Sequence, residues 1–245
     1  MNKNKIACII AIVLVLLFFG CANDESSERN NQYSYPIIEY TDDPVLQTLG
    51  ALGINAYENI NPVSASPDAL YPEWTKYSFD VNDCKCISGA EYSVYEKKSA
   101  ISNNVIFYLQ GGGACWPGQD FCTKEVGSPG DSSGMYSSNE DNPLKNWNVV
   151  YVPYCDGSIH MGDASSDDAF YWGFRNTSAA VNVLKEQYPS PDKILIAGCS
   201  AGGYGSFISY MLIRYHFPNI PLYIYNESGP GIWNPDDPDT LSLVL

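Results

Sequence analysis

The segment 194–205 constrains the fold of this chain most strongly. It consists of an apolar, β-branched run, then Gly-Cys-Ser-Ala-Gly with Ser200 at its centre, then a helix-like pattern. A serine between a strand and a helix in this spacing is typical of a nucleophile elbow, a tight turn that holds the serine in a strained conformation. Gly198 and Gly202 suit that turn because a side chain at either position would clash with neighbouring backbone. We therefore predict Ser200 as a catalytic nucleophile, with a plain strand–helix turn as the alternative.

A glycine-rich stretch follows another apolar strand, predicted at 104–109. Gly111, Gly112 and Gly113 suit a loop whose backbone N–H groups approach a ligand closely. In α/β hydrolases such a loop supplies one half of the oxyanion hole, and the helix N-terminus beside the serine faces the same charge. A flexible turn is the alternative. A phosphate loop would need a Gly-Lys-Ser/Thr signature, which this chain lacks.

The order of the predicted elements indicates the fold class. We predict strands at 92–95, 104–109, 148–154, 194–199 and 221–225, helices at 46–57, at 169–188 after capping residues at 165–168, and at 200–215, and a long loop at 115–146. The first two strands are expected to be joined by a polar turn at 97–103. Strands that alternate with helices favour a mostly parallel sheet with flanking helices, as in an α/β-hydrolase-like fold. In such a sheet, ligands bind where the strands end.

A serine nucleophile needs a base, usually histidine, that an acid orients. The chain holds two histidines. His216 lies at the far end of the helix that follows Ser200, about 24 Å away at 1.5 Å per residue, so it cannot be the base. His160 lies on a loop at the correct edge of the sheet, where we favour a hydrogen-bonding or substrate-contacting role over that of general base. Asp163 and Glu227 are further candidates for the edge of the site.

The catalytic residues of α/β hydrolases follow the order serine, acid, histidine. Only 45 residues follow Ser200, and none of them after position 216 is a histidine. The sheet would also lack its last strands and expose an apolar edge. We therefore expect the fold to be incomplete at its C-terminal edge. The triad acid and base would then be missing, and this form could be inactive.

The N-terminus has the features of an export signal. Lys3 and Lys5 precede the apolar run 6–19, which is too short to span a bilayer comfortably, and Gly20-Cys21 follows. We predict a bacterial lipoprotein-type signal at 1–20, lipid on Cys21, a polar tether at 21–36 and a globular domain at 37–245. Phe19 departs from the small residue usual at its position, and a short, uncleaved membrane anchor is the alternative. We expect an exported protein, lipid-anchored to a bacterial membrane at the cell surface or in the periplasm.

The net charge and the cysteines of the chain limit which binding partners and metals we expect. The chain has 28 acidic and 13 basic residues, and its formal net charge of −15 argues against nucleic acid. Beyond the signal and the lipid position, the cysteines are Cys84, Cys86, Cys115, Cys122, Cys155 and Cys199. Export permits disulfides, and we expect Cys199 to be free and buried, so at least one of the other five lacks a partner within the chain. Zinc is a poor interpretation because no Cys-x-x-Cys pairs or histidine partners accompany them.

Four motifs follow one another between residues 86 and 203. They are Cys-Ile-Ser-Gly-Ala-Glu-Tyr at 86–92, Leu-Gln-Gly-Gly-Gly-Ala-Cys at 109–115, Tyr-Cys-Asp-Gly-Ser at 154–158 with Gly-Asp at 162–163, and Gly-Cys-Ser-Ala-Gly-Gly at 198–203. Together they resemble the pectin acetylesterase family, which includes the Notum carboxylesterases. The resemblance implies that Ser200 is the nucleophile and that the oxyanion hole is formed by the N–H groups of Gly112, Gly113 and Ala201. The family's acid and histidine lie beyond the end of this chain.

Two positions depart from the family's pattern. Gln110 replaces an acidic residue usual in the glycine loop, and Glu227 stands where aspartate is usual. We expect a serine esterase that hydrolyses O-acyl esters through an acyl-enzyme on Ser200, without a metal or cofactor. The resemblance implies acetyl groups on a polysaccharide such as pectin, with a lipid acyl group on a protein as the Notum-like alternative. A serine peptidase and a non-catalytic surface lipoprotein that binds glycan or a partner stay open.

Overall fold

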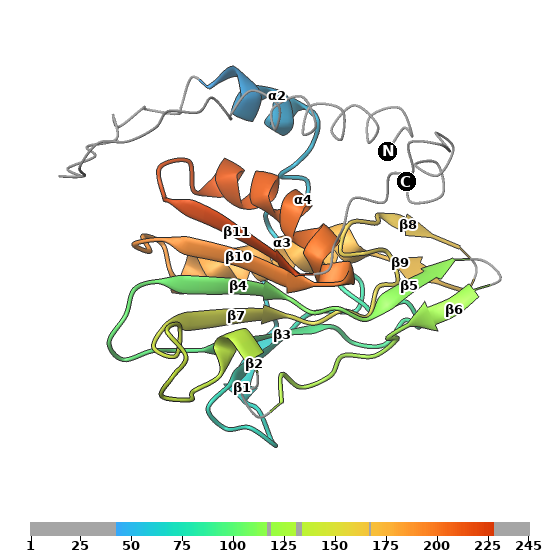
Figure 1. Ribbon diagram of the computed structural model, residues 1–245. Helices are drawn as coiled ribbons and strands as arrows, with labels where there is room; N and C mark the ends of the chain where they lie inside the picture. Colours follow the sequence, from blue (N-terminus) through green and yellow to red (C-terminus); the bar gives the residue numbers. More distant parts are fainter. Residues whose placement is uncertain (1–42, 117–118, 131–133, 167, 228–245) are drawn as a thin grey trace, which may run out of the picture. The chain divides into compact units, whose positions relative to one another are not determined.

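The computed structural model describes residues 43–116, 119–130, 134–166 and 168–227 (Figure 1). The chain divides into two compact units, one of 1–54 with 231–245 and the other of 55–230. The described part of the first unit contains helix α2 (Pro44–Ala51), which begins where Asp43 accepts the N–H of Val45 at 2.7 Å. The predicted signal, Cys21 and the tether lie outside the described residues. No helix in the described part of the chain is long and apolar enough to cross a bilayer.

The second unit is built on a sheet whose described strands run in the order β1-β2-β3-β7-β4-β10-β11. Their bounds are β1 (Ser64–Pro67), β2 (Thr75–Ser78), β3 (Ser93–Lys97), β7 (Asn148–Val152), β4 (Val105–Leu109), β10 (Ile194–Cys199) and β11 (Leu222–Glu227). The strands β7, β4, β10 and β11 are parallel to one another, whereas β1, β2 and β3 pair antiparallel and β3 is also antiparallel to β7. This confirms the predicted α/β class with a mostly parallel sheet, to which β1–β3 add an antiparallel extension.

Two helices pack on one side of this sheet, α3 (Gly173–Gln187) and α4 (Ala201–His216) (Figure 1). The α3 face includes Ala180, Val183 and Leu184, all fully buried, as the helical spacing predicts. The opposite side of the sheet carries an aromatic cluster that includes Trp74, Tyr95 and Tyr151. Apolar layers on both faces explain why β4 and β7 are almost continuously buried.

The predicted polar turn does join β3 to β4, but the two strands do not form a hairpin. They are not neighbours, because β7 lies between them, antiparallel to β3 and parallel to β4. Asn148, the first residue of β7, holds the segment 99–104 that leads from β3 to β4. Its Nδ2 donates to the carbonyls of Ser102 at 2.7 Å and Asn104 at 3.0 Å, and its Oδ1 accepts the N–H of Ser99 at 2.8 Å. The Asn148 side chain thus supplies three hydrogen bonds to the turn. In a β3–β4 hairpin, such bonds would have come from β3 itself.

Helix α3 begins later than predicted. The strand β8 (Ala164–Ser165) pairs with β9 (Phe170–Tyr171) in a two-stranded ribbon, and the helix starts only at Gly173. The ribbon is held by aromatic contacts, since Trp172 donates its Nε1–H to Ser165 at 2.8 Å and Lys85 lies 4.3 Å from the ring centre of Phe170. Because of these tertiary contacts, β8 and β9 form a ribbon although the sequence here contains residues that commonly cap a helix.

The long loop also contains structure that the sequence did not reveal. A hairpin of β5 (Gly113–Trp116) and β6 (Gln119–Cys122) follows the glycine stretch directly, and a single 3-10 turn, η2 (Gly134–Tyr136), comes later. The disulfide Cys115–Cys122 closes this hairpin, and a second disulfide joins Cys86 to Cys155. Cys84 is free and buried, and burial raises the pKa of its thiol. Cys199 is free, as predicted, but only partly buried, which corrects the expectation that it is enclosed.

Candidate active site

Ser200 occupies the turn between β10 and α4 in a strained backbone conformation. Its φ is 54° and its ψ is −118°, a region that costs a non-glycine residue about 1–3 kcal/mol. The turn is closed by the Ser200 N–H, which donates to the carbonyl of Glu227 at 2.9 Å. A Cβ on Gly198 would stand 2.1 Å from the carbonyl oxygen of Gly202. The predicted tight turn and its need for glycine at 198 are therefore confirmed.

The glycine loop lies directly against this turn. It follows β4, which pairs parallel with β10, so both loops leave the sheet at the same edge. A Cβ on Gly111 would stand 2.5 Å from the carbonyl oxygen of Cys199 and 3.2 Å from the Cβ of Ser200. The backbone of the loop can come this close to the serine only because position 111 has no side chain.

The remaining loop glycines are also held in place. Gly112 accepts the N–H of Thr123 at 2.9 Å, and a Cβ on Gly112 would meet the Tyr154 ring at 2.6 Å. Gly113 has a φ of 82°, a conformation that L residues rarely adopt. Ala201 is the first residue of α4, where backbone N–H groups have no partner within the helix. The structure thus brings the predicted oxyanion donors to the strand ends where Ser200 lies.

The two histidines occupy different environments. His160 is 2% exposed, and its Nε2 lies 2.8 Å from the carbonyl oxygen of Gln110. Burial lowers the pKa of His160, although Asp156 and the bond to Gln110 act in the opposite direction. A neutral ring beside a carbonyl oxygen must carry its proton on Nε2. His216 is the last residue of α4, and burial together with Lys185 lowers its pKa to about 4.

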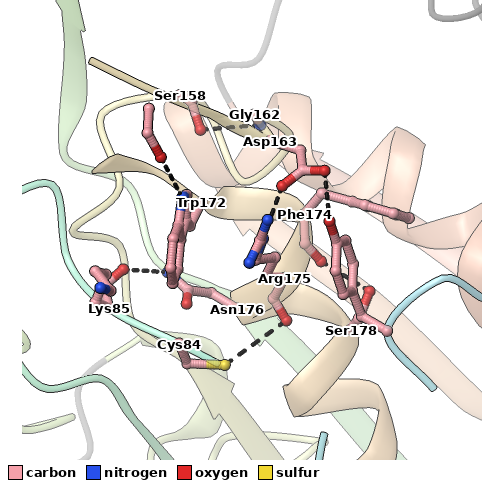
Figure 2. Close-up of polar contacts among 12 residues, drawn as sticks. Cys84, Lys85, Ser158, Gly162, Asp163, Trp172, Phe174, Arg175, Asn176 and Ser178 are labelled. Carbon is pink, nitrogen blue, oxygen red and sulfur yellow. Dashed lines mark hydrogen bonds and ion pairs between the residues drawn. The ribbon is translucent and has the colours of Figure 1, made fainter. Parts of the chain in front are cut away.

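The two candidate carboxylates are also placed differently. Asp163 accepts the Nε–H of Arg175 at 2.8 Å and the hydroxyl of Tyr57 at 2.5 Å. Figure 2 shows this pair beside the ring of Trp172, whose centre is 4.2 Å from the Arg175 guanidinium carbon. Asp163 therefore ties the loop after β7 to the first turn of α3. The side chain of Glu227 is exposed, and its backbone carbonyl is the partner of the Ser200 turn.

Sequence reasoning missed several residues that build the site. Asp156 is 1% exposed and accepts both the N–H of Ser158, at 2.8 Å, and the Ser158 hydroxyl. The Asp-Gly-Ser order is a turn signature that could have indicated this local bond. Gln110 stands out in the sequence only as a departure from the family's pattern, and nothing there indicates that its side-chain Oε1 accepts the N–H of Tyr154. Among the described residues, no group of three or more His, Cys, Asp or Glu side chains could hold a metal ion.

Comparison with known proteins places these features in a family. The family model described as Pectinacetylesterase matches residues 77–233, well over half of the chain. Pectin acetylesterase 11 of Arabidopsis thaliana is 27% identical over 143 residues, which are 50% of this chain and 36% of that protein. Palmitoleoyl-protein carboxylesterase notum1 of Xenopus laevis is 25% identical over 232 residues, which are 86% of this chain and 46% of that protein. The chain therefore spans less than half the length of these curated relatives.

Proposed function

This chain belongs to the pectinacetylesterase family, and on that premise we propose that it is a serine esterase that cleaves O-acetyl esters of a polysaccharide such as pectin. One structural observation supports the proposal independently of the family match. Ser200 is held at positive φ with the backbone of Gly111 packed against it, so a nucleophile and a row of backbone donors share one sheet edge. Neither a serine in a plain turn nor a flexible glycine loop needs this arrangement.

The proposed reaction has two steps. The Ser200 hydroxyl oxygen attacks the ester carbonyl, a base accepts its proton, and the sugar hydroxyl leaves from the tetrahedral intermediate. The backbone N–H groups of Gly112, Gly113 and Ala201 stabilise the negative oxygen in that intermediate, and loss of one such donor costs about 3–4 kcal/mol in the rate. Water then hydrolyses the acyl-enzyme and releases acetate. The first turn of α4 adds the favourable end of its dipole to the same oxygen.

A second substrate class is a fatty acyl ester on a protein. Its support is the match to palmitoleoyl-protein carboxylesterase notum1, which covers 86% of this chain, against 50% for pectin acetylesterase 11. Both relatives are named for carboxylic ester cleavage, so the chemistry at Ser200 would be the same. The two classes differ only in the acyl group and in what carries it.

Acetate release tests the proposal. The full-length protein is incubated with acetylated pectin and, in parallel, with a palmitoleoylated peptide and an unmodified peptide. We expect acetate from pectin, none from a Ser200→Ala variant, and wild-type rates from Ser64→Ala, a control in the exposed strand β1 at the other end of the sheet. Acetate release by Ser200→Ala would overturn the assignment of the nucleophile. Cleavage of the unmodified peptide would favour a peptidase.

We also propose that the protein is exported and carries lipid on Cys21. The two disulfides of the described chain support export, because such bonds persist in oxidising compartments. Metabolic labelling with a radioactive fatty acid should tag the wild-type protein and leave Cys21→Ala untagged and released from membranes. Equal labelling of both proteins would contradict the proposal.

A further inference from the structure

Gln110, which joins β4 to the glycine loop, is held at three points. Its N–H donates to the carbonyl of Val152 at 3.0 Å, and its side-chain Oε1 accepts the N–H of Tyr154 at 3.0 Å. Its carbonyl oxygen accepts the third bond, from Nε2 of His160 at 2.8 Å. The first two bonds continue the pairing of β4 with β7. The third comes from a side chain outside the sheet.

The Gln110 carbonyl sets the direction of the loop that follows. A peptide unit is planar, so fixing this carbonyl also fixes the N–H of Gly111, which points the opposite way. The same peptide lies against the elbow, since a Cβ on Gly202 would stand 3.0 Å from the Gln110 carbonyl carbon. Three glycines in a row have little conformational preference of their own, so an external bond must select one orientation.

His160 is built into the fold for this contact. Ile159 and His160 both have positive φ, 53° and 64°, which costs free energy in residues with side chains. The His160 carbonyl accepts the hydroxyl of Thr177 from α3 at 3.1 Å. On the α4 side, Gly205 leaves the space for the ring, because a Cβ there would stand 3.0 Å from the His160 Cβ and Cδ2. The ring also packs on Tyr154, with 4.9 Å between ring centres.

We propose that His160 is a positioning residue, whose Nε2–H holds the Gln110 carbonyl and thereby aims the loop's N–H groups at the oxyanion that forms on Ser200. This inference rests on the proposed function. It differs from a role as general base, in which the unprotonated Nδ1 of the ring would have to accept the Ser200 proton. The neutral ring that burial favours can still donate from Nε2, when its proton is on that nitrogen.

The two roles predict different responses to substitution. In His160→Gln the amide nitrogen can take the place of Nε2 as a donor, but an amide cannot act as a base. In His160→Leu a side chain of similar size offers no donor. Oxyanion stabilisation acts on the transition state and not on the bound substrate, so a misaligned loop lowers kcat and leaves KM unchanged.

The experiment measures kcat and KM for acetate release by the full-length protein and its variants. We expect His160→Leu to lower kcat about 10- to 100-fold, below the effect of removing a direct donor, with KM within about twofold. His160→Gln should recover kcat to within about fivefold of wild type. Val183→Ala, a cavity variant in the buried face of α3, controls for general loss of stability and should keep wild-type kcat.

Each contrary result has its own meaning. Wild-type kcat in His160→Leu would overturn the positioning role while leaving the proposed function intact. Equal, complete loss in His160→Leu and His160→Gln would overturn it in favour of a base. Activity in Ser200→Ala would mean that the proposed function itself is wrong. Should His160→Leu fail to fold, His160→Phe keeps an aromatic ring but has no donor, and an unchanged kcat there would equally overturn the inference.

Discussion

The carbonyl oxygen of Leu109 lies so close to Gly202 that a Cβ on Gly202 would stand 2.0 Å from it. This contact joins the end of β4 to the first turn of α4 and so fixes the glycine loop relative to the elbow. Gly202→Ala should destabilise the protein by about 1–3 kcal/mol or more through overpacking, although alanine is the better helix former by about 1 kcal/mol. Urea unfolding measures the effect. The control is Gly127→Ala, which has no atom within 4 Å of the new Cβ, and equal stability of the two variants would contradict this account.

A buried carboxylate joins the end of α3 to the sheet. Glu96 on β3 is 1% exposed and accepts the hydroxyls of Tyr77 at 2.8 Å and Tyr188 at 2.7 Å. Tyr188→Phe removes one hydrogen bond to a charged group and should cost about 1.5–3 kcal/mol of the free energy of unfolding. Tyr210→Phe, whose ring lies beside Arg214 on α4, is the matched control and should change stability little. If Tyr188→Phe were as stable as this control, the hydrogen bond from Tyr188 to Glu96 would contribute nothing measurable to the free energy of unfolding.

The two disulfides close loops of very different length. Cys86 and Cys155 are 69 residues apart in sequence, whereas Cys115 and Cys122 are 7 apart. Because a cross-link restricts the unfolded chain more when the loop is longer, replacing the first pair with alanines should cost about 4 kcal/mol and replacing the second about 2 kcal/mol. Denaturant unfolding of the two double variants under oxidising conditions gives the comparison. The reverse order of costs would mean that loop entropy is not the governing effect.

Alkaline pH should destabilise the fold through its buried and half-buried tyrosines. Burial is the main cause that raises the pKa of Tyr57, Tyr95 and Tyr108 to about 12, from an ordinary value of 10. The folded state therefore holds these protons more tightly, and its stability advantage is complete below pH 10 and is lost as the pH rises from 10 to about 12. The urea midpoint should fall across that interval, less steeply in Tyr57→Phe. A midpoint that stays level to pH 12 would contradict the prediction.

The centre of the fold could be predicted because its signals are local. The strands β4 and β10 are short apolar runs with glycine at or just beyond their ends, and the Gly-Cys-Ser-Ala-Gly spacing fixes the turn around Ser200 regardless of the rest of the chain. Parallel pairing of the two strands then brings their following loops to one edge. The juxtaposition of Gly111 with Ser200 is thus a consequence of two local patterns and one topological rule.

The parts that sequence reasoning missed depend on contacts between distant segments. Nothing near Asn148 indicates that its side chain supports the crossing of 99–104, which places β7 between β3 and β4. The start of α3 moved to Gly173 because Trp172 and Lys85, far apart in sequence, hold the β8–β9 ribbon. The partner of His160 is likewise 50 residues away, so neither its burial nor its bond to Gln110 could be read from the loop itself.

The most direct test of the central claim is to find which residue becomes covalently modified at the active site. The full-length protein is treated with a fluorophosphonate probe, digested, and the modified peptide is sequenced by mass spectrometry. We expect one modified peptide with the probe on Ser200, no labelling of Ser200→Ala, and normal labelling of Ser64→Ala. Equal labelling of Ser200→Ala, or a wild-type protein that releases acetate while Ser200 stays unmodified, would contradict it.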